Sequence, residues 1–451
     1  MVSDVVLGMN RFMNEFAAKL LILIFGITYW IYGCMHLSDL LLNVLYITAM
    51  IMAVFLFLSR SKYSFNKIVF FLIALSALGT IISTDNRKIT VFILIYICIE
   101  VVVLANCSEG KDERALKKEL SIISNVFMFM SLIVVAGTLY TYTKGISRYY
   151  SYSEIMNGTL VLGIDKVTGA LVGIFSNANA LSSFLVQAIG LKLYMMNDKR
   201  HHFLSWCYIV LLLGTLYLTR SRGGLIGALI VFVAYYFSCF RKYFLKWSAK
   251  SLFVILMIIG IGIIALLVIN GFGIEKIVKR DSLEMGRSTA SRQFLWSAGI
   301  RTVLSDPMIF IFGVGGNIRE AISMHIDPTV SRNLYSNMHN IYIQTAVEFG
   351  ILGLILLLLM FMRYVINSMK MILENFGENN DLMPLAGLLV SLTVMSFVES
   401  DLYMGKTFLS TLFWIVGGYV YRILILRKTR GSLQYKSNDI KYTFESKELQ
   451  I

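Results

Sequence analysis

The first candidate site for chemistry in this chain is a pair of arginines in a turn between two apolar segments. Arg220 and Arg222 flank a serine in the turn 219–224, which continues into two glycines. Guanidinium groups stay charged and bind phosphate oxygens through two parallel hydrogen bonds, and glycines let the backbone approach a ligand closely. We interpret the turn as a clamp for a phosphate or diphosphate. The alternative is a tight hairpin whose arginines anchor it to lipid headgroups.

His339 is the strongest single candidate for acid–base chemistry. It lies directly before the long apolar run 341–361, where a helix would start at a membrane surface. A helix N-terminus favours negative charge nearby, and a histidine can take a proton from a sugar hydroxyl at neutral pH. The next residue, Asn340, belongs to the same candidate site. The alternative is an interfacial histidine that only caps the helix.

Three further polar side chains lie in or beside apolar segments and need partners there. Asn177 and Asn179 are two residues apart near one end of the predicted span 169–195. They could bind sugar hydroxyls or a neighbouring helix. Glu348 is a carboxylate inside the run 341–361, and such acids usually face the protein interior with a partner, for which we consider Arg220 or Arg222.

The polar segment 271–340 would bring more arginines to the same surface. Its basic residues slightly outnumber its acidic ones, and Arg287 and Arg292 are candidates for binding an anion, although each alone could equally face water or lipid. Residues 291–304 read as an amphipathic helix lying on the bilayer or the spans, which Asp306 and Pro307 end.

A second feature of this segment is the glycine-rich run 313–316. It looks like a phosphate-binding loop but follows no βαβ unit. We therefore predict a tight turn and not a dinucleotide site.

The segments that must position these residues are long enough to cross a bilayer. The 451 residues are 57% hydrophobic and 15% charged, whereas soluble domains carry about 25% charge. Crossing the hydrocarbon core takes about 20 apolar residues. We predict an all-α polytopic membrane protein with about 12 transmembrane helices at 16–35, 38–58, 67–84, 88–107, 119–142, 169–195, 203–219, 223–240, 251–270, 340–364, 383–400 and 404–426.

Basic residues fall in alternate connections, which assigns those connections to the cytoplasm. Both termini are then cytoplasmic, and the segment 271–340, between spans nine and ten, is a large extracytoplasmic loop. We predict a transmembrane domain at 1–427 with this loop inserted, and a basic cytoplasmic tail at 428–451 that is poorly ordered. The net charge of +14 fits cytoplasmic loops and anionic lipids, so no nucleic-acid partner is expected. No cysteine, histidine or aspartate spacing predicts a metal site.

The order of these motifs resembles the O-antigen ligase and polymerase superfamily over about residues 169–364. Its members are polytopic glycosyltransferases that use polyprenyl-diphosphate-linked glycans outside the bacterial inner membrane. The resemblance rests on Asn177-Ala178-Asn179-Ala180, Ser221-Arg222-Gly223-Gly224, Arg292…Trp296…Asp306-Pro307…Gly313-Val314-Gly315 and His339-Asn340…Glu348-Phe349-Gly350…Gly353-Leu354.

The resemblance implies a GT-C-like helical fold and metal-independent chemistry. Carried over, the diphosphate-binding role falls on Arg222 and on Arg287 or Arg292, and the acceptor role on His339. With the residues chosen above, we expect His339, Arg222 and Arg292 to be catalytic. The expected substrate-binding residues are Arg220, Arg287, Asn177, Asn179, Asn340 and Glu348.

The function that this pattern favours is a polymerase of lipid-linked oligosaccharide repeat units for a surface polysaccharide, O-antigen or capsule. It would transfer glycan from undecaprenyl diphosphate to a lipid-linked acceptor. One alternative is a ligase that transfers finished glycan to a lipid core or protein, and another is a non-enzymatic lipid-oligosaccharide flippase. Expected partners are undecaprenyl-diphosphate-linked oligosaccharides and membrane lipids, with a chain-length regulator and a flippase as candidate protein partners.

Overall fold

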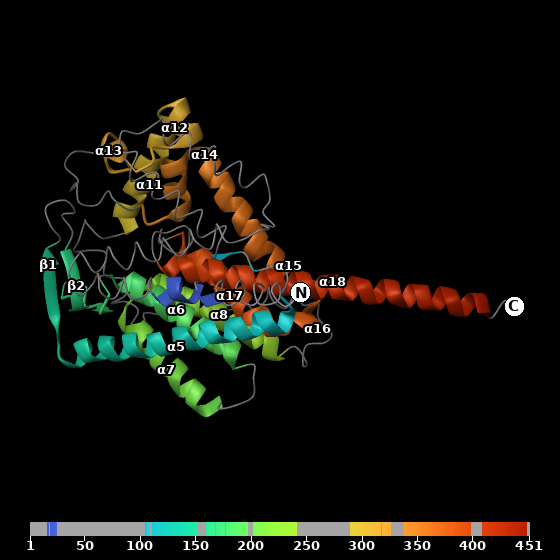
Figure 1. Ribbon diagram of the computed structural model, residues 1–451. Coiled ribbons are helices and arrows are strands. Elements are labelled where there is room, and N and C mark those ends of the chain that lie inside the picture. Colours follow the sequence, from blue (N-terminus) through green and yellow to red (C-terminus); the bar gives the residue numbers. More distant parts are fainter. Residues whose placement is uncertain are drawn as a thin grey trace, which may run out of the picture.

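Helices that lie side by side make up most of the described chain (Figure 1). The computed structural model describes residues 111–151, 159–175, 177–196, 202–240, 289–325, 338–397 and 408–448, except 167 and 317, with short pieces at 16–24, except 18, and 104–107, except 106. Among these residues, helices at Glu113–Thr143, Arg222–Cys239 and Ile341–Glu374 are long and apolar enough to cross a membrane. The predicted spans 38–58, 67–84 and 251–270 lie outside the described residues, and 16–35 and 88–107 lie mostly outside them.

The core of the bundle is built around α6 (Ala178–Met195). This helix is buried on nearly all sides, as expected for an apolar helix in a bundle interior. It packs against α5 (Glu113–Thr143), α7 (His202–Leu218), α8 (Arg222–Phe240) and α17 (Met383–Met395), and α17 also packs along α8. Helices therefore occupy the predicted spans 119–142, 203–219, 223–240 and 383–400, the last of which ends earlier than predicted.

A small antiparallel sheet lies between α5 and α6, so the prediction of an all-α chain is wrong in this region. Strands β1 (Ser147–Ser151), β2 (Thr159–Ile164) and β3 (Leu171–Gly173) pair in the order β1-β2-β3. Tyrosine, threonine and valine in these strands favour extended backbone. The predicted span 169–195 therefore contains a strand before its helix begins at residue 178.

Helix α14 (Ile341–Phe361) occupies the predicted span 340–364 but is broken at Gly350, a break that the span did not predict. Gly350 has φ 64° and ψ −162°, a conformation that is essentially restricted to glycine. The break removes helical partners from nearby carbonyl groups. The carbonyls of Val347 and Glu348 instead accept the N–H groups of Val314 and Gly315 at 2.8 and 2.9 Å.

The turn 313–316 thus satisfies backbone groups that would otherwise be costly to leave unpaired in apolar surroundings. The backbone of the turn and the backbone of α14 lie so close together that only glycine fits at positions 313 and 350. A Cβ at Gly350 would lie 2.3 Å from the carbonyl oxygen of Ile311, and a Cβ at Gly313 would lie 2.4 Å from the carbonyl carbon of Glu348.

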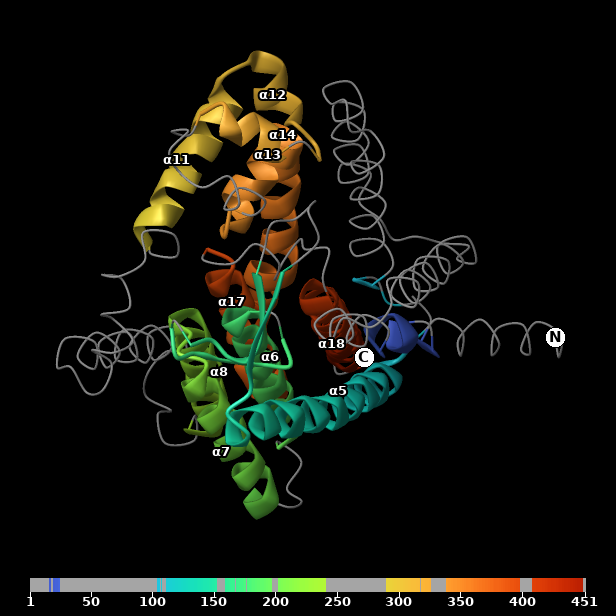
Figure 2. The ribbon, with the colours of Figure 1, turned by 90° about the vertical axis from the view of Figure 1, so that its left-hand side faces the viewer.

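The described part of segment 271–340 packs around the first half of α14. Helices α11 (Thr289–Leu304), α12 (Pro307–Phe312) and α13 (Ile318–Ser323) gather there, apart from α5 to α8 (Figure 2). The predicted helix at 291–304 is confirmed as α11. Asp306 caps α12 by accepting the N–H of Met308 at 2.7 Å, and Pro307 is its first residue. The group shares a small core of Leu295, Ala298, Val314, Ile318, Ile322, Met338 and Val347.

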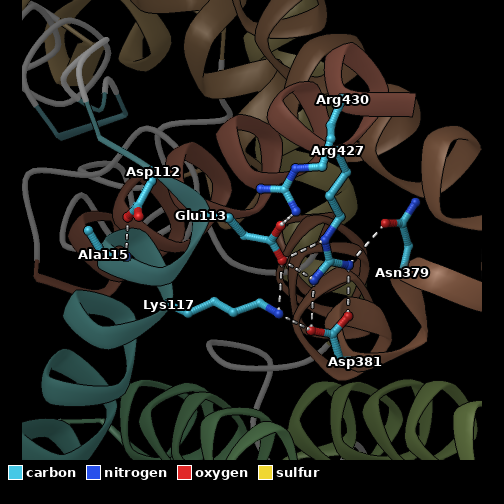
Figure 3. Close-up of polar contacts among 8 residues, drawn as sticks. All are labelled: Asp112, Glu113, Ala115, Lys117, Asn379, Asp381, Arg427 and Arg430. Carbon is cyan, nitrogen blue, oxygen red and sulfur yellow. Dashed lines mark hydrogen bonds and ion pairs between the residues drawn. The ribbon is translucent and has the colours of Figure 1, made fainter. Parts of the chain in front are cut away.

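At the opposite end of the bundle, an ion network joins three parts of the chain (Figure 3). Arg427 of α18 (Phe408–Glu448) donates to Glu113 at the start of α5 at 2.8 and 2.9 Å. The same guanidinium donates to both oxygens of Asp381 at 2.9 and 3.0 Å, and to Asn379 at 3.0 Å. Lys117 pairs with both carboxylates, at 3.1 and 2.9 Å. Asn379 and Asp381 belong to α16 (Phe376–Asn379) and the turn η6 (Asn380–Leu382).

Charge pairing sets the ionisation of this network. Burial alone raises the pKa of the Glu113 and Asp381 carboxyl groups, but hydrogen bonds from Arg427 and Lys117 lower it by more. Both pKa values therefore lie below their ordinary ones. The two carboxylates stay ionised at neutral pH and hold α5, η6 and α18 together.

Helix α18 continues past Arg427 to Glu448 and extends beyond the rest of the described chain (Figure 1). Residues 428–448 of the predicted tail are helical, and the poor order expected of this tail stays a prediction. The stretch 428–448 contains no proline, has lysine as its commonest residue and has a single glycine, Gly431. A helix that already exists can propagate through such residues at little cost.

Replacing Gly350 by alanine tests the broken helix. Gly350→Ala should destabilise the protein by at least about 2 kcal/mol, because the left-handed backbone and the contact with α12 both exclude a Cβ. Thermal unfolding of the detergent-purified protein measures this loss. Gly214→Ala in α7 is the matched control, since no atom lies within 4 Å of its added Cβ; it should be neutral or stabilising by up to about 1 kcal/mol. Equal effects of the two substitutions would contradict this account.

Replacing Arg427 by glutamine tests the ion network. Arg427→Gln leaves two partly buried carboxylates short of a partner and should cost on the order of 2 kcal/mol at neutral pH. The stabilisation from carboxyl groups with lowered pKa is complete above their ordinary values of 4.5 and 3.8 and is lost as pH falls through the folded values. Unfolding midpoints measured from about pH 7 to about pH 3 should therefore fall less steeply in the variant. The control Lys428→Gln, at an exposed position, should follow the parent curve.

Candidate functional site

The ends of four helices meet at the end of the bundle opposite the ion network. Helices α6, α8 and α14 begin there, and α17 ends there (Figures 1 and 2). The hydroxyl of Ser182 in α6 donates to Ser221 before α8 at 2.9 Å. The N–H of Ile341 donates to the carbonyl of Ser396, just after α17, at 3.0 Å. Three positive helix ends therefore point toward one region, which favours an anion.

Most of the predicted site residues stand at these helix ends. They are Asn177, Asn179, Arg220, Arg222, His339 and Asn340. Arg292 lies on α11, and Glu348 lies seven residues into α14. Arg287 lies outside the described residues.

The two arginines of the turn have different surroundings. Arg222 is the first residue of α8 and its side chain is exposed. Arg220 adopts φ 54°, and its Nη1 donates to the carbonyl of Thr168 at 2.6 Å. A Cβ on the neighbouring Gly169 would lie 2.6 Å from the same Nη1. Arg220 therefore anchors the turn between β2 and β3, while Arg222 faces outward from the helix end.

The two asparagines form the start of α6, close to one end of the predicted span 169–195. Asn177 caps the helix, and its side-chain oxygen accepts the N–H of Asn179 at 2.9 Å. The carbonyl of Asn179 accepts the hydroxyls of Ser182 and Ser183, both at 2.8 Å. The side chain of Asn177 is exposed and that of Asn179 is half-buried, so both lie at the open end of the bundle.

His339 has a strained backbone. Its φ is 48°, and within the described part of the chain only Arg220 shares this left-handed conformation among residues other than glycine. The left-handed region costs a residue with a Cβ roughly 1–2 kcal/mol. Such strain persists only where the surroundings impose it, and it clusters at functional sites. His339 is half-buried between two well-fixed neighbours.

Asn340 fixes the start of α14. Its side-chain oxygen accepts the N–H groups of Tyr342 and Ile343 at 3.0 and 3.1 Å. Its side-chain nitrogen donates to the carbonyl of Phe397 at 3.2 Å. The amide thus joins α14 to the end of α17, and its place directly after His339 makes it part of the frame of the site.

Glu348 is buried, with 5% of its surface exposed. Its carboxylate accepts a hydrogen bond from Gln344 at 3.2 Å, whereas Arg220, one of its two predicted partners, donates to Thr168. Gln344 was not among the predicted site residues, although its position four residues before Glu348 places both on one helix face. Among the residues that the structure describes, no group of histidine, cysteine or acidic side chains could hold a metal ion.

Parts of this chain are similar to a protein family and to an individual protein. Residues 207–358 match the model of a family described as O-Antigen ligase. The exopolysaccharide production protein ExoQ of Rhizobium meliloti (strain 1021) is 27% identical over 194 residues, which cover 41% of this chain and 42% of ExoQ. The chain therefore matches less than half the length of this relative.

The family match includes α8, α11 and the kinked α14, and so contains Arg222 and His339. Both matches are similarities over part of the chain, and they agree with the resemblance to the O-antigen ligase and polymerase superfamily that its motifs indicate.

Proposed function

We propose that this protein is a glycosyltransferase that polymerises lipid-linked oligosaccharide repeat units of a surface polysaccharide. It would transfer the growing glycan from undecaprenyl diphosphate to the end of the next lipid-linked unit. The observation that carries the proposal is that Arg222 and the strained His339 stand at the starts of α8 and α14, and that α17 is hydrogen-bonded to both of these helix starts through Ser391 and Ser396. The similarity to the O-Antigen ligase family model and to ExoQ supports it.

Arg222 and the helix ends would act on the donor. The bond between the sugar's anomeric carbon and a phosphate oxygen breaks, and the electron pair leaves with the lipid diphosphate. Fixed positive groups stabilise the charge that develops on this leaving group. Arg222 suits this role because its exposed guanidinium stands at the first turn of α8. Arg287 and Arg292 are the candidates to complete the diphosphate site.

His339 would act on the acceptor. The acceptor hydroxyl oxygen forms a bond to the anomeric carbon, and its proton passes to the imidazole. Asn340 and Glu348 belong to the same helix and would frame the sugar-binding side. This division places donor chemistry at α8 and acceptor chemistry at α14, whose starts are joined through the end of α17.

The active site would face the outside of the bacterial inner membrane. Support comes from the opposite end of the bundle, where Lys117, Arg427 and Arg430 gather. Basic residues favour the cytoplasmic side. The helix ends around His339 then face outward, where a lipid-linked substrate docks after export, with a flippase and a chain-length regulator as candidate partners.

A ligase that transfers finished glycan to a lipid core or protein is the second candidate, and the description of the matching family favours it. The relative named for exopolysaccharide production favours polymerisation, which we place first. Loss of a polymerase leaves single carrier-linked units, whereas loss of a ligase leaves carrier-linked polymer. A flippase, the candidate of another class, would release no free carrier diphosphate from a labelled donor.

Replacing His339 or Arg222 by alanine tests the proposal. We expect His339→Ala to slow release of undecaprenyl diphosphate from a labelled donor by a factor of about 100 to 10,000 through loss of the base. Arg222→Ala should slow it by a factor of about 100 to 1,000 through loss of charge stabilisation. The measurement uses purified protein in detergent with a carrier-linked donor and acceptor.

Lys370→Ala is the control, because Lys370 is 66% exposed and pairs only weakly with Glu374 at 3.9 Å at the other end of the bundle. It should keep full activity. Parental rates in well-folded His339→Ala and Arg222→Ala proteins would sink the proposed roles. Absence of carrier-diphosphate release from the unaltered protein would sink the transferase itself.

A further inference from the structure

The peptide groups just before His339 are held by two side chains from different helices. The N–H of Met338 donates to the side-chain oxygen of Gln344 at 3.2 Å. The carbonyl of Met338 accepts the indole N–H of Trp296, on α11, at 2.9 Å. Met338 itself is fully buried in the small core of α11 to α14. Neither the N–H group nor the carbonyl group of Met338 can rotate without breaking a hydrogen bond.

The residues just after His339 are held as firmly. Asn340 donates to the carbonyl of Phe397 at 3.2 Å, and the N–H of Ile341 donates to Ser396 at 3.0 Å. Contacts from α11, α14 and the end of α17 therefore fix both flanks of a single residue. The left-handed backbone of His339 is the conformation that connects these fixed flanks.

Gln344 is itself oriented by a carboxylate. Its side-chain nitrogen donates to Glu348 at 3.2 Å. Because an amide has distinct donor and acceptor ends, this bond turns the oxygen of Gln344 toward the N–H of Met338. A chain of contacts thus runs from the buried Glu348 through Gln344 to the peptide before His339.

We infer that Trp296 and Gln344 are positioning residues that hold the imidazole of His339 in place for the transfer reaction. The inference rests on the proposed function for its catalytic meaning. We call the two hydrogen bonds that join Trp296 and Gln344 to Met338 the clamp. The effect of the clamp on His339 can be measured without substrate. Segment 271–340 then has a definite task, because α11 supplies one of the two contacts to Met338.

The first test measures the reactivity of His339 in the intact protein. Trp296→Phe removes the indole N–H and keeps an aromatic ring, and Gln344→Met removes the amide at similar volume. Each variant should raise the rate at which diethyl pyrocarbonate modifies His339 by roughly threefold or more, because the released segment opens more often. Peptide mass spectrometry reads each site separately, and modification of His325 serves as the internal reference.

Trp206→Phe and Gln187→Met are the matched controls. Trp206 packs on Tyr235 and Tyr236 in the bundle, and Gln187 is fully buried in α6. Both should leave modification of His339 unchanged. A monodisperse elution profile in detergent confirms that each variant is folded, and either Trp296→Phe or Gln344→Met alone suffices for the test.

The second test separates positioning from substrate binding. In both clamp variants kcat for carrier-diphosphate release should fall by about tenfold, while KM for the lipid-linked donor changes by less than about twofold. A rise in KM with unchanged kcat would overturn the positioning role, as would unchanged reactivity of His339 in the folded variants. If the unaltered protein releases no carrier diphosphate, the proposed function fails, and the labelling result still decides whether the clamp exists.

Discussion

The hydrogen bonds between the turn 313–316 and the break in α14 are the interaction on which the packing of α11 to α13 against α14 depends. Backbone groups in apolar surroundings must find partners, and a helix that stops in mid-course leaves carbonyls without them. Val314 and Gly315 supply the donors. Because the carbonyl groups at the break have hydrogen-bond donors, the first half of α14 can run in a different direction from the second half. Helices α11 to α13 pack around this first half, and His339 lies at its start.

Much of the helical framework could be predicted from the sequence, because hydropathy alone determines where membrane helices lie. Helices α7 and α8 begin and end within one or two residues of the predicted spans. Strand β3 could not be separated from span six, since a short run such as Leu171–Gly173 suits a strand and a membrane helix equally. The break at Gly350 depends on the turn 313–316, which is distant in the sequence, and no local sequence pattern predicts it.

Only some features of the candidate site could be predicted from the sequence. Arg222, His339 and Asn340 could be chosen from residue type and position at the edge of an apolar run. The contact of Arg220 with Thr168 could not, because it requires the turn between β2 and β3 to be folded beside α8. Gln344 was missed because a single uncharged polar residue in an apolar helix has many roles. Its importance emerges only when its partners on both sides, Met338 and Glu348, are seen together.

The close approach of Gly313 to the backbone of α14, and of Gly350 to the backbone of α12, also restricts how this protein can be recombined with its relatives. Each glycine faces the main chain of the other element and not its side chains, so no compensating side-chain change elsewhere can make room for a larger residue. A chimera that exchanges the segment 271–340 alone would join two backbones shaped for different partners. The natural unit of exchange runs from that segment through Gly350, and its downstream junction belongs in the second half of α14.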